Sequence, residues 1–393
     1  MKKAGFRGFN TRAVQAGEIK DPRFGNVTTP IFQTSTFEAP NTTENAYIDN
    51  TTGKPFMYGR WGNPTIQAFE EKYASLEGSG HALAFSSGMG AISATVLSMV
   101  GKGEKLLALN ELYGQTYTLF ARTMRGLGIE TDFLTLSEIN RAEFDARKYK
   151  TVFIESIVNP TMGVADVKRI ARVCSEADVP LIVDATFASP YNQRPIELGA
   201  RVVVHSVTKY IGGHSDLIMG IAGCSGKEFS GTANLRKALG ANPDPIQSYL
   251  AMRGLKTLGL RMEKHNSNGM TLSRFLSDHK KIRKVMYPGL ETSEFHSIAK
   301  ENLSGYGGML AFEVKGGIQA ARTLMKNLRI ASPAPSLGGV ESLITLPVDT
   351  SHGGLTPEER MKAGIPDGLV RFSAGIEDAE DLVEDFNLAL EKI

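Results

Sequence analysis

Six short runs of apolar residues recur in the first part of the chain, and segments with helical periodicity separate several of them. The segment 166–177 (DVKRIARVCSEA) has the apolar spacing of an amphipathic helix. Continuous apolar runs divided by helices are typical of a parallel sheet that is covered on both faces. The pattern therefore predicts an α/β fold. The six runs are HALAFSS (81–87), KLLALN (105–110), TDFLTL (131–136), TVFIES (151–156), PLIVDA (180–185) and RVVVHS (201–206).

The pattern changes on both sides of these runs, and this change indicates three parts. Residues 1–60 lack sustained periodicity and contain Thr/Asn clusters, so we expect an extended arm that could wrap around a partner subunit. Residues 61–245 contain the alternating runs and helices. Residues 246–393 begin with a largely helical stretch and continue with strands such as MLAFEV and LVRFSA. We expect this last part to form a smaller α/β domain that ends in a helix.

Composition and charge exclude several classes of protein. The chain has 44 basic and 42 acidic residues without a Lys/Arg block, which argues against a nucleic-acid partner. No run approaches the roughly 18 apolar residues of a membrane span, and no apolar core follows the basic start as in a secretory signal. Cys174, in a helical pattern, and Cys224, ending a strand-like run, form no disulfide framework, so we expect buried, reduced thiols. These features favour a cytoplasmic enzyme.

The histidines do not predict a metal site. Seven are present, and only His205 and His214 lie at a spacing that approaches a zinc pair. We expect these two side chains to serve hydrogen bonding or packing.

Two charged residues follow predicted strands, at the edge where parallel sheets bind ligands. Asp184 ends the run LIVD, and Lys209 comes shortly after VVVHS. Pyridoxal phosphate (PLP) needs a lysine amine to form an imine and a carboxylate to keep its pyridine nitrogen protonated. Burial would lower the pKa of the lysine and so make it reactive. The pair predicts a PLP site, although Lys209 could instead open a surface helix and Asp184 could cap one.

A candidate phosphate site lies after the first run. The segment 86–100 (SSGMGAISATVLSMV) combines a strand end, a glycine turn and a helix start. Free backbone N–H groups at a helix start bind a dianion, and Gly88 and Met89 are the expected donors. Ser206 and Thr208, beside the lysine, could add hydroxyl groups to the same phosphate. Ordinary turn capping is the alternative for these two hydroxyls.

A set of longer motifs resembles the Cys/Met-metabolism PLP enzymes. That family includes cystathionine γ-synthase, cystathionine γ-lyase, methionine γ-lyase and O-acetylhomoserine sulfhydrylase. The resemblance covers essentially the whole chain, in order, and as a set the motifs are highly specific. They are YGRWGNPT (58–65), SSGMGAI (86–92), LYGQTY (112–117), VDATFASP (183–190), HSVTKYIGGHSD (205–216), MRGLKTLGLRM (252–262), SLGGVESL (336–343) and LVRFSAGIEDAEDL (369–382).

The resemblance implies the architecture of a fold-type I PLP-dependent transferase. This is a mostly parallel sheet with helices on both faces, in a PLP-binding domain (61–245), plus a smaller C-terminal α/β domain (246–393). It also implies a homotetramer, a dimer of dimers whose active sites are shared between subunits. Lys209 would be the Schiff-base lysine and Asp184 the partner of the pyridinium. Tyr113 would stack on the cofactor ring and act as an acid or base near the leaving group.

The resemblance also assigns the binding residues. Gly88, Met89, Ser206 and Thr208 would hold the phosphate. Tyr58 and Arg60 would reach the phosphate of the neighbouring subunit, a role that suits a phenol hydroxyl and a guanidinium fork. Without the family they would be a surface pair in an exposed arm. The carboxylate of a small amino-acid substrate would be bound by Arg371, Ser336 and Asn159.

Three positions depart from the usual family pattern. Ala185 stands where many members have Asn, and Phe372 replaces the more usual Leu. Gln115 stands where many members have a small residue or Cys, and it could change the pocket. None of the three removes a chemical group that the reaction requires.

The family implies γ-elimination or γ-replacement on a γ-substituted amino acid. Its cystathionine enzymes commonly carry acidic residues at two positions that are Met57 and Pro335 here, and these cannot hold a distal ammonium. A methionine γ-lyase-like reaction is therefore favoured, although Gln115 in place of Cys weakens that assignment. O-acetylhomoserine sulfhydrylase and the cystathionine enzymes stay open, and an aminotransferase is a remote alternative. A Rossmann nucleotide binder would leave Lys209 unexplained, and no G-x-G-x-x-G follows the first strands.

Overall fold

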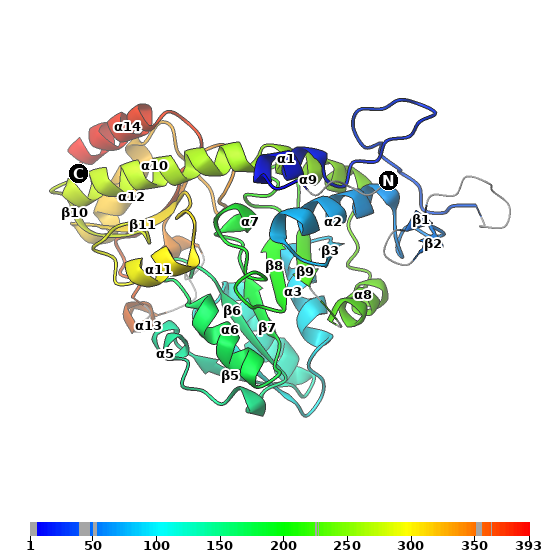
Figure 1. The fold of residues 1–393 in the computed structure, drawn as a ribbon. Helices are drawn as coiled ribbons and strands as arrows, with labels where there is room; N and C mark the ends of the chain where they lie inside the picture. Colours follow the sequence, from blue (N-terminus) through cyan, green and yellow to red (C-terminus); the bar gives the residue numbers. More distant parts are fainter. Residues whose placement is uncertain are drawn as a thin grey trace.

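In the described part of the chain, a seven-stranded and a five-stranded sheet have helices packed around them, and a third sheet has only two strands (Figure 1). The computed structural model describes residues 6–38, 48–49, 53–224, 226, 228–350, 356–362 and 364–393. The seven-stranded sheet lies within residues 61–245 and the five-stranded sheet within residues 246–393. An α/β fold is confirmed, while the exact division into three parts stays a prediction.

The large sheet contains all six predicted strands. A seventh strand, β9, lies between β3 and β8 and runs antiparallel to both. The other neighbouring pairs are parallel, so the sheet is mostly parallel as predicted. In sheet order the strands are β3 (His81–Phe85), β9 (Gly220–Cys224), β8 (Val202–Ser206), β7 (Leu181–Asp184), β6 (Thr151–Glu155), β4 (Lys105–Leu109) and β5 (Glu130–Leu134).

The strands at the centre of this sheet are buried on both faces. Leu181, Ile182 and Val183 follow one another in β7, and none is more than 1% exposed. Because successive side chains of a strand point to opposite faces, both faces must be covered. Figure 1 shows helix α6 (Val167–Glu176) over β6 and β7. Its first turn is capped by Asp166, whose carboxylate accepts a hydrogen bond from the Arg169 amide.

Further helices connect and cover the large sheet. The predicted helix 166–177 corresponds to α6, which buries Val167, Ile170 and Cys174. Helix α3 follows β3 and packs against β8 and β9. The other helices of this part are α2 (Pro64–Glu77), α3 (Gly88–Leu97), α4 (Gly114–Thr118), the π-helix η2 (Leu119–Met124), α5 (Leu136–Arg141), the 3-10 turn η3 (Ala146–Lys148), α7 (Ser189–Asn192) and α8 (Glu228–Leu239).

The smaller sheet is mainly antiparallel. Its strands, in sheet order, are β10 (Ile282–Met286), β11 (Met309–Val314), β14 (Leu369–Ser373), β13 (Leu343–Thr345) and β12 (Ser332–Pro333), and only β12 and β13 are parallel. The predicted helical stretch after residue 245 and the final helix are confirmed. The helices of this part are α9 (Pro245–Lys256), α10 (Leu258–Asp278), α11 (His296–Asn302), α12 (Gly317–Asn327), the 3-10 turn η4 (Pro347–Asp349), α13 (Pro357–Lys362) and α14 (Ala379–Glu391).

The first 60 residues form little regular structure where the structure describes them. They contain helix α1 (Phe9–Gln15) and the short paired strands β1 (Ile48–Asp49) and β2 (Lys54–Pro55). The assignment of residues 1–60 to an extended arm stays a prediction. Residues 39–47 and 50–52 lie outside the described part of the chain.

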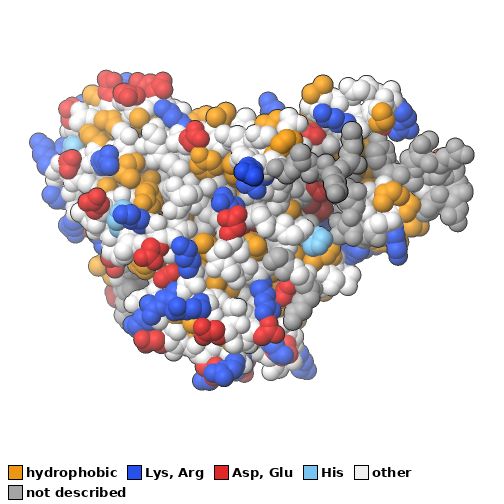
Figure 2. All heavy atoms as spheres, viewed as in Figure 1, with side chains coloured by type: hydrophobic (Ala, Val, Ile, Leu, Met, Phe, Trp, Pro, Cys, Tyr) orange, Lys and Arg blue, Asp and Glu red, His pale blue; other side chains and the backbone are white. Residues whose placement is uncertain are grey.

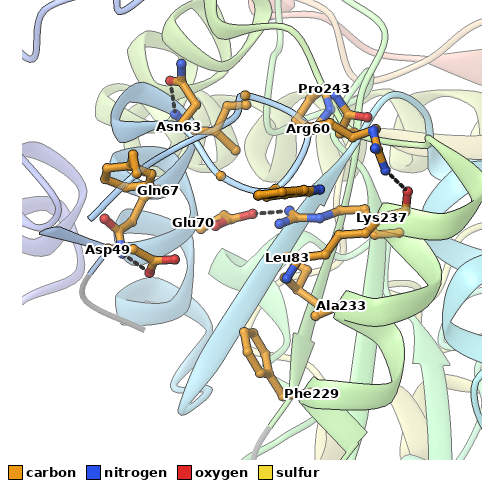
Figure 3. A pocket seen from close by; sticks show the side chains of 17 residues that line it. Asp49, Arg60, Asn63, Gln67, Glu70, Leu83, Phe229, Ala233, Lys237 and Pro243 are labelled. Atoms are coloured by element: carbon orange, nitrogen blue, oxygen red, sulfur yellow. Dashed lines mark hydrogen bonds and ion pairs between the residues drawn. The ribbon is translucent and has the colours of Figure 1, made fainter. Parts of the chain in front are cut away.

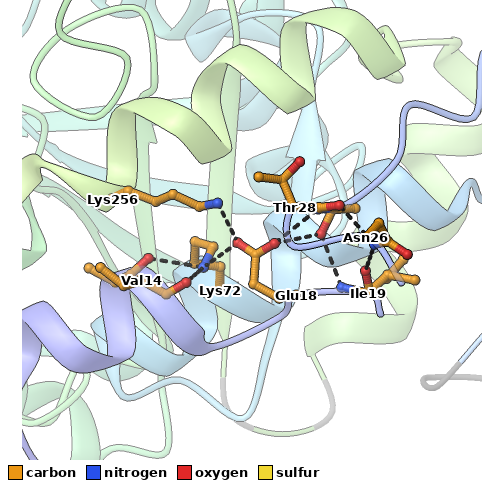
Figure 4. A network of polar contacts seen from close by, with 9 residues as sticks. Val14, Glu18, Ile19, Asn26, Thr28, Lys72 and Lys256 are labelled. Atoms are coloured by element: carbon orange, nitrogen blue, oxygen red, sulfur yellow. Dashed lines mark hydrogen bonds and ion pairs between the residues drawn. The ribbon is translucent and has the colours of Figure 1, made fainter. Parts of the chain in front are cut away.

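A buried ionic network attaches the start of the arm to the same chain (Figure 4). The Glu18 carboxylate lies 3.2 Å from Lys72 Nζ on α2 and 2.8 Å from Lys256 Nζ on α9. It also accepts hydrogen bonds from the amide and hydroxyl of Thr29. The ammonium of Lys72 donates in addition to the carbonyl of Val14. Through Glu18 and Thr29, these contacts hold the loop that follows α1 against α2 and α9.

Figure 2 shows basic and acidic side chains interspersed over the visible face. Within the described residues, no helix combines the length and the apolar character needed to cross a membrane. Cys174 and Cys224 are buried free thiols, as predicted.

Candidate active site

A cavity of about 270 Å³ opens where the carboxyl ends of the large-sheet strands face the smaller sheet. Side chains that follow β4, β6, β7 and β8 contribute to its wall, as do residues beside β13 and β14. Every predicted site residue except Tyr58 and Arg60 lines this cavity. The predicted residues that line the cavity are Gly88, Met89, Tyr113, Asn159, Asp184, Ser206, Thr208, Lys209, Ser336 and Arg371.

The Lys209 amine lies in this cavity, just beyond β8. Its Nζ donates a hydrogen bond to Ser336 Oγ at 2.9 Å. Burial, and then the nearby charge of Arg371, lower the pKa of Lys209 to about 8. An amine with this pKa is partly neutral near neutral pH, as imine formation requires.

The Asp184 carboxyl lies at the end of β7 and lines the cavity. Its Oδ1 accepts hydrogen bonds from the backbone amide of Thr186 at 2.9 Å and from the Thr186 hydroxyl at 2.5 Å. Burial raises the pKa of Asp184, because a charged carboxylate is costly in a dry site. A cationic pyridinium would offset that cost, so this carboxyl fits the nitrogen of PLP.

The start of α3 can receive a phosphate at the same cavity. Ser87 caps the helix by accepting a hydrogen bond from the Gly90 amide at 3.0 Å. A Cβ at Gly88 would lie 3.0 Å from Ser206 Cβ, so glycine lets the helix start approach the end of β8. The backbone N–H groups of the first turn, together with the helix dipole, suit a dianion. The hydroxyl of Thr208, in contrast, exchanges hydrogen bonds with the backbone of Met219.

The Tyr113 ring stands at the edge of the cavity, on the turn between β4 and α4. It is 47% exposed, so one face is free for a flat ligand to cover. The backbone amide of Tyr113 donates to Glu155 Oε1 at 2.6 Å and thereby fixes the turn.

A buried guanidinium occupies the side of the cavity formed by the smaller sheet. Arg371, on β14, donates to Asn159 Oδ1 and to the carbonyl of Ser336, each at 3.1 Å. Burial lowers its pKa to about 10. In the described part of the chain Arg371 forms no ion pair with a carboxylate, although it is only 8% exposed. A buried cation of this kind suits the carboxylate of an amino acid.

Tyr58 and Arg60 together line another pocket of the chain, and Arg60 also lines the pocket shown in Figure 3. Arg60 Nη1 donates to the carbonyl of Lys237 at 2.8 Å, and its guanidinium lies 5.6 Å from the centre of the Tyr58 ring. Neither residue lines the cavity around Lys209 of its own chain. Their predicted contact with a neighbouring subunit is not tested by a single chain and stays a prediction.

The three departures from the family pattern lie outside or beneath this cavity. Gln115 is exposed on α4 and does not line the cavity of its own chain, and its influence on the pocket stays a prediction. Ala185 and Phe372 are fully buried. Phe372 packs against Phe386 at 4.9 Å between ring centres, so it belongs to the core of the smaller domain.

The structure adds two residues that the sequence analysis did not identify. Glu155 ends β6 inside the cavity and Thr186 holds the carboxyl of Asp184. Glu155 follows the pattern that identified Asp184, since an acidic residue closes an apolar run in both. A threonine after a strand is too common to identify Thr186 from sequence.

Comparisons with known proteins agree with this site. A family model described as Cys/Met metabolism PLP-dependent enzyme matches residues 10–391. The chain is 40% identical to a cystathionine gamma-lyase of Dictyostelium discoideum, with 97% of both chains covered. It is also 40% identical to an L-methionine gamma-lyase of Fusobacterium nucleatum subsp. polymorphum, with 98% of both covered.

Further matches lead to the same family. A cystathionine beta-lyase of Lactococcus lactis is 40% identical over 97% of this chain and 98% of its own. A solved structure of cystathionine gamma-lyase from Lactobacillus plantarum complexed with L-serine superposes with a TM-score of 0.90 at 33% identity, covering 98% of this chain and 99% of the other. The buried amine, carboxyl and helix start fit PLP as their shared cofactor. The chain therefore belongs to the Cys/Met-metabolism family of PLP-dependent enzymes, which includes carbon–sulfur lyases.

Proposed function

We propose that this enzyme catalyses γ-elimination on a sulfur-containing amino acid in the manner of a methionine γ-lyase. Its products would be 2-oxobutanoate, ammonia and a thiol. The composition of the cavity wall carries the proposal. Apolar side chains, which include Ile157, Ile218 and Pro335, line the same cavity as Lys209.

The acidic groups of the cavity are already engaged. Within the described residues of this chain, Glu155 and Asp184 are the acidic side chains that line it. Each accepts hydrogen bonds from backbone amides nearby. Among the residues that the structure describes, no further carboxylate lines the cavity to bind the distal ammonium of cystathionine. Pro335, one of the two positions that are commonly acidic in cystathionine enzymes, lines the cavity. The other position, Met57, is 48% exposed on the arm and lies outside the cavity of its own chain.

The proposed roles follow from the positions of the groups. Bound PLP would supply the electron sink that stabilises negative charge at the substrate Cα. Lys209 would hold the cofactor and then move the Cα proton, and Asp184 would keep the pyridine nitrogen protonated. Tyr113, at the mouth of the cavity, would protonate the leaving group.

The binding groups complete the proposal. The phosphate would be held by the amides of Gly88 and Met89 and by the hydroxyls of Ser206 and Thr208. Thr208 would have to exchange its present contacts with Met219 for that role. The substrate carboxylate would be bound by Arg371, Ser336 and Asn159.

We further propose a cytoplasmic homotetramer in which Tyr58 and Arg60 complete the phosphate site of a neighbouring subunit. In support, Phe24 and Val27 on the arm are 79% and 84% exposed, a surface that a partner would cover. Arg60→Ala should weaken PLP retention without unfolding the protein. Unchanged PLP affinity, or a monomer in light scattering, would contradict the shared site.

The reaction is tested with a substrate panel. Purified, PLP-loaded enzyme is incubated with methionine, cystathionine or O-acetylhomoserine, each with and without an added thiol, and 2-oxobutanoate is measured. We expect keto acid from methionine without a thiol. Keto acid from cystathionine but not from methionine would overturn the argument from the cavity wall. If O-acetylhomoserine with a thiol gives a thioether instead, the enzyme is a sulfhydrylase.

A half-reaction separates the aminotransferase alternative. An aminotransferase would transfer the substrate amino group to the cofactor and return it to an added keto acid. We expect no amino transfer from this enzyme under conditions that give 2-oxobutanoate.

A further inference from the structure

Glu155 is a buried carboxyl inside the cavity for which the reaction as described has no role. It ends β6, where it pairs in register with Asp184 on β7. Its side chain is 6% exposed and lines the cavity. A buried carboxyl is retained only where it is well hydrogen-bonded, so its contacts indicate its function.

The hydrogen bonds of Glu155 join two turns of the active site. Its Oε1 accepts from the backbone amide of Tyr113 at 2.6 Å, on the turn after β4. The backbone amide of Asn159, on the turn after its own strand, also lies close enough to this carboxyl to lower its pKa. One side chain therefore faces both the turn that carries Tyr113 and the turn that carries Asn159.

The second turn leads on to the substrate arginine. Asn159 Oδ1 accepts a hydrogen bond from Arg371 Nη1 at 3.1 Å. Arg371 is separated from Asn159 by 212 positions in the chain and comes from the smaller sheet. A displacement of the turn at Asn159 would therefore reach the guanidinium that we propose as the carboxylate-binding group.

The environment of Glu155 favours hydrogen bonding over charge. Burial, and then the charge of the neighbouring Asp184, hold the pKa of Glu155 well above its usual range. Two buried carboxyls this close do not both ionise, and the pyridinium would select Asp184 as the anion. A neutral carboxyl still offers oxygen lone pairs to both amides.

We propose that Glu155 is a positioning residue, which holds the turns of Tyr113 and Asn159 in register through hydrogen bonds and not through charge. The proposal rests on the proposed function for the roles of these two turns. It predicts that a neutral side chain of the same shape can replace Glu155. An apolar one cannot, because two buried amides would lose their acceptor.

The test compares Glu155→Gln with Glu155→Leu in the PLP-loaded enzyme. Visible circular dichroism of the bound cofactor reports ring placement without any substrate. KM and kcat are measured with whichever panel amino acid the wild type converts. We expect Glu155→Leu to change the dichroism and lower kcat/KM roughly tenfold to a hundredfold, with KM raised. Glu155→Gln should restore the dichroism, KM and pH profile to near wild type.

Asp385→Leu is the matched control. Asp385 is a 2% exposed carboxyl that accepts hydrogen bonds from two backbone amides, at Arg329 and Ile330, far from the cavity on α14. The Asp385→Leu substitution should lower thermal stability without changing the dichroism or KM. If Glu155→Leu does not fold, Glu155→Asp replaces it, since the shorter side chain cannot reach both amides and should give a smaller loss of the same kind.

Two results would overturn the proposal. A Glu155→Gln variant as defective as Glu155→Leu would show that the negative charge is needed. A Glu155→Leu or Glu155→Asp variant with wild-type dichroism and KM would show that the residue positions nothing. Failure of the methionine reaction alone leaves both readouts intact, because the dichroism needs no substrate and KM is measured on the substrate that reacts.

Discussion

At the scale of single residues, reactivity is set by what surrounds a group. Lys209 combines burial, a neighbouring guanidinium and a hydrogen bond to Ser336. The first two disfavour its ammonium form, and together they lower its pKa to about 8. The lysine is thereby prepared to react with an aldehyde before the cofactor arrives.

This predicts a pH dependence for cofactor binding. The rate of imine formation by the apoenzyme with PLP should rise with pH, with a midpoint near 8, because the neutral amine is the reactive form. Arg371→Met removes a positive charge, so the pKa of Lys209 and the midpoint should move upward, by up to about one unit. Stopped-flow absorbance measures both profiles. Arg329→Met, at a side chain 71% exposed and far from the cavity, is the control.

A midpoint near the usual value of a lysine in the wild type would contradict this account. So would a profile that does not move in Arg371→Met. Both outcomes are read without substrate, so the role of Arg371 in substrate binding does not affect them.

Sequence could identify the reactive residues but not their supports. Lys209 and Asp184 were predicted because charged residues rarely close strands that are otherwise buried. Thr186 and the bond between Lys209 and Ser336 were not predicted. The latter joins positions 127 apart in the chain, and only the tertiary structure brings them together.

At the scale of elements, the phosphate site depends on close packing between β9 and the start of α3. A Cβ at Gly220 would overlap the carbonyl oxygen of Ser87 and lie 2.8 Å from Gly88 Cα. Both contacts are to backbone, which cannot move aside as a side chain would. The helix start must therefore shift if residue 220 is larger than glycine.

Gly220→Ala should accordingly weaken PLP binding. A shift of α3 moves the amides of Gly88 and Met89 away from the end of β8, and we expect the Kd for PLP to rise roughly tenfold or more. Fluorescence titration of the apoenzyme measures it. Gly126→Ala is the control, because a Cβ there meets nothing within 4 Å. Equal PLP affinity in the two variants would show that the phosphate does not bind at this helix start.

Regular elements were predicted where their patterns are strong. All six apolar runs are strands, and the amphipathic segment 166–177 is α6. β9 differs because it is built from small residues, GIAGC, which leave little hydrophobic signal, and it pairs antiparallel with β8. The strands β12 and β13, of two and three residues, are too short to leave a pattern.

At the scale of the whole molecule, the site belongs to both sheets. The large sheet supplies Lys209 and Asp184, while the smaller sheet supplies Ser336 and Arg371. The sequence predicted a larger and a smaller α/β part, but not the distances across them. Hydrophobic periodicity reports which face of an element is buried and carries no information about which element covers it.

The resemblance to a family supplied what periodicity could not. Arg371 lies in a strand whose sequence alone gives no reason to place a charge inside. The structure buries it beside Asn159, where a substrate carboxylate would complete its contacts. The residues assigned to a neighbouring subunit, Tyr58 and Arg60, lie outside this cavity and need the assembled protein for their test.

We propose that Lys209 holds PLP in this cavity. The most direct measurement is the visible absorbance of the PLP-loaded protein and of Lys209→Ala, followed by borohydride reduction and peptide mapping. We expect the imine band in the wild type, a reduced adduct on Lys209, and loss of band and turnover in Lys209→Ala, with some PLP still held through its phosphate. A Lys209→Ala variant that keeps the band, or an adduct on another lysine, would contradict the assignment of Lys209 as the lysine that holds PLP.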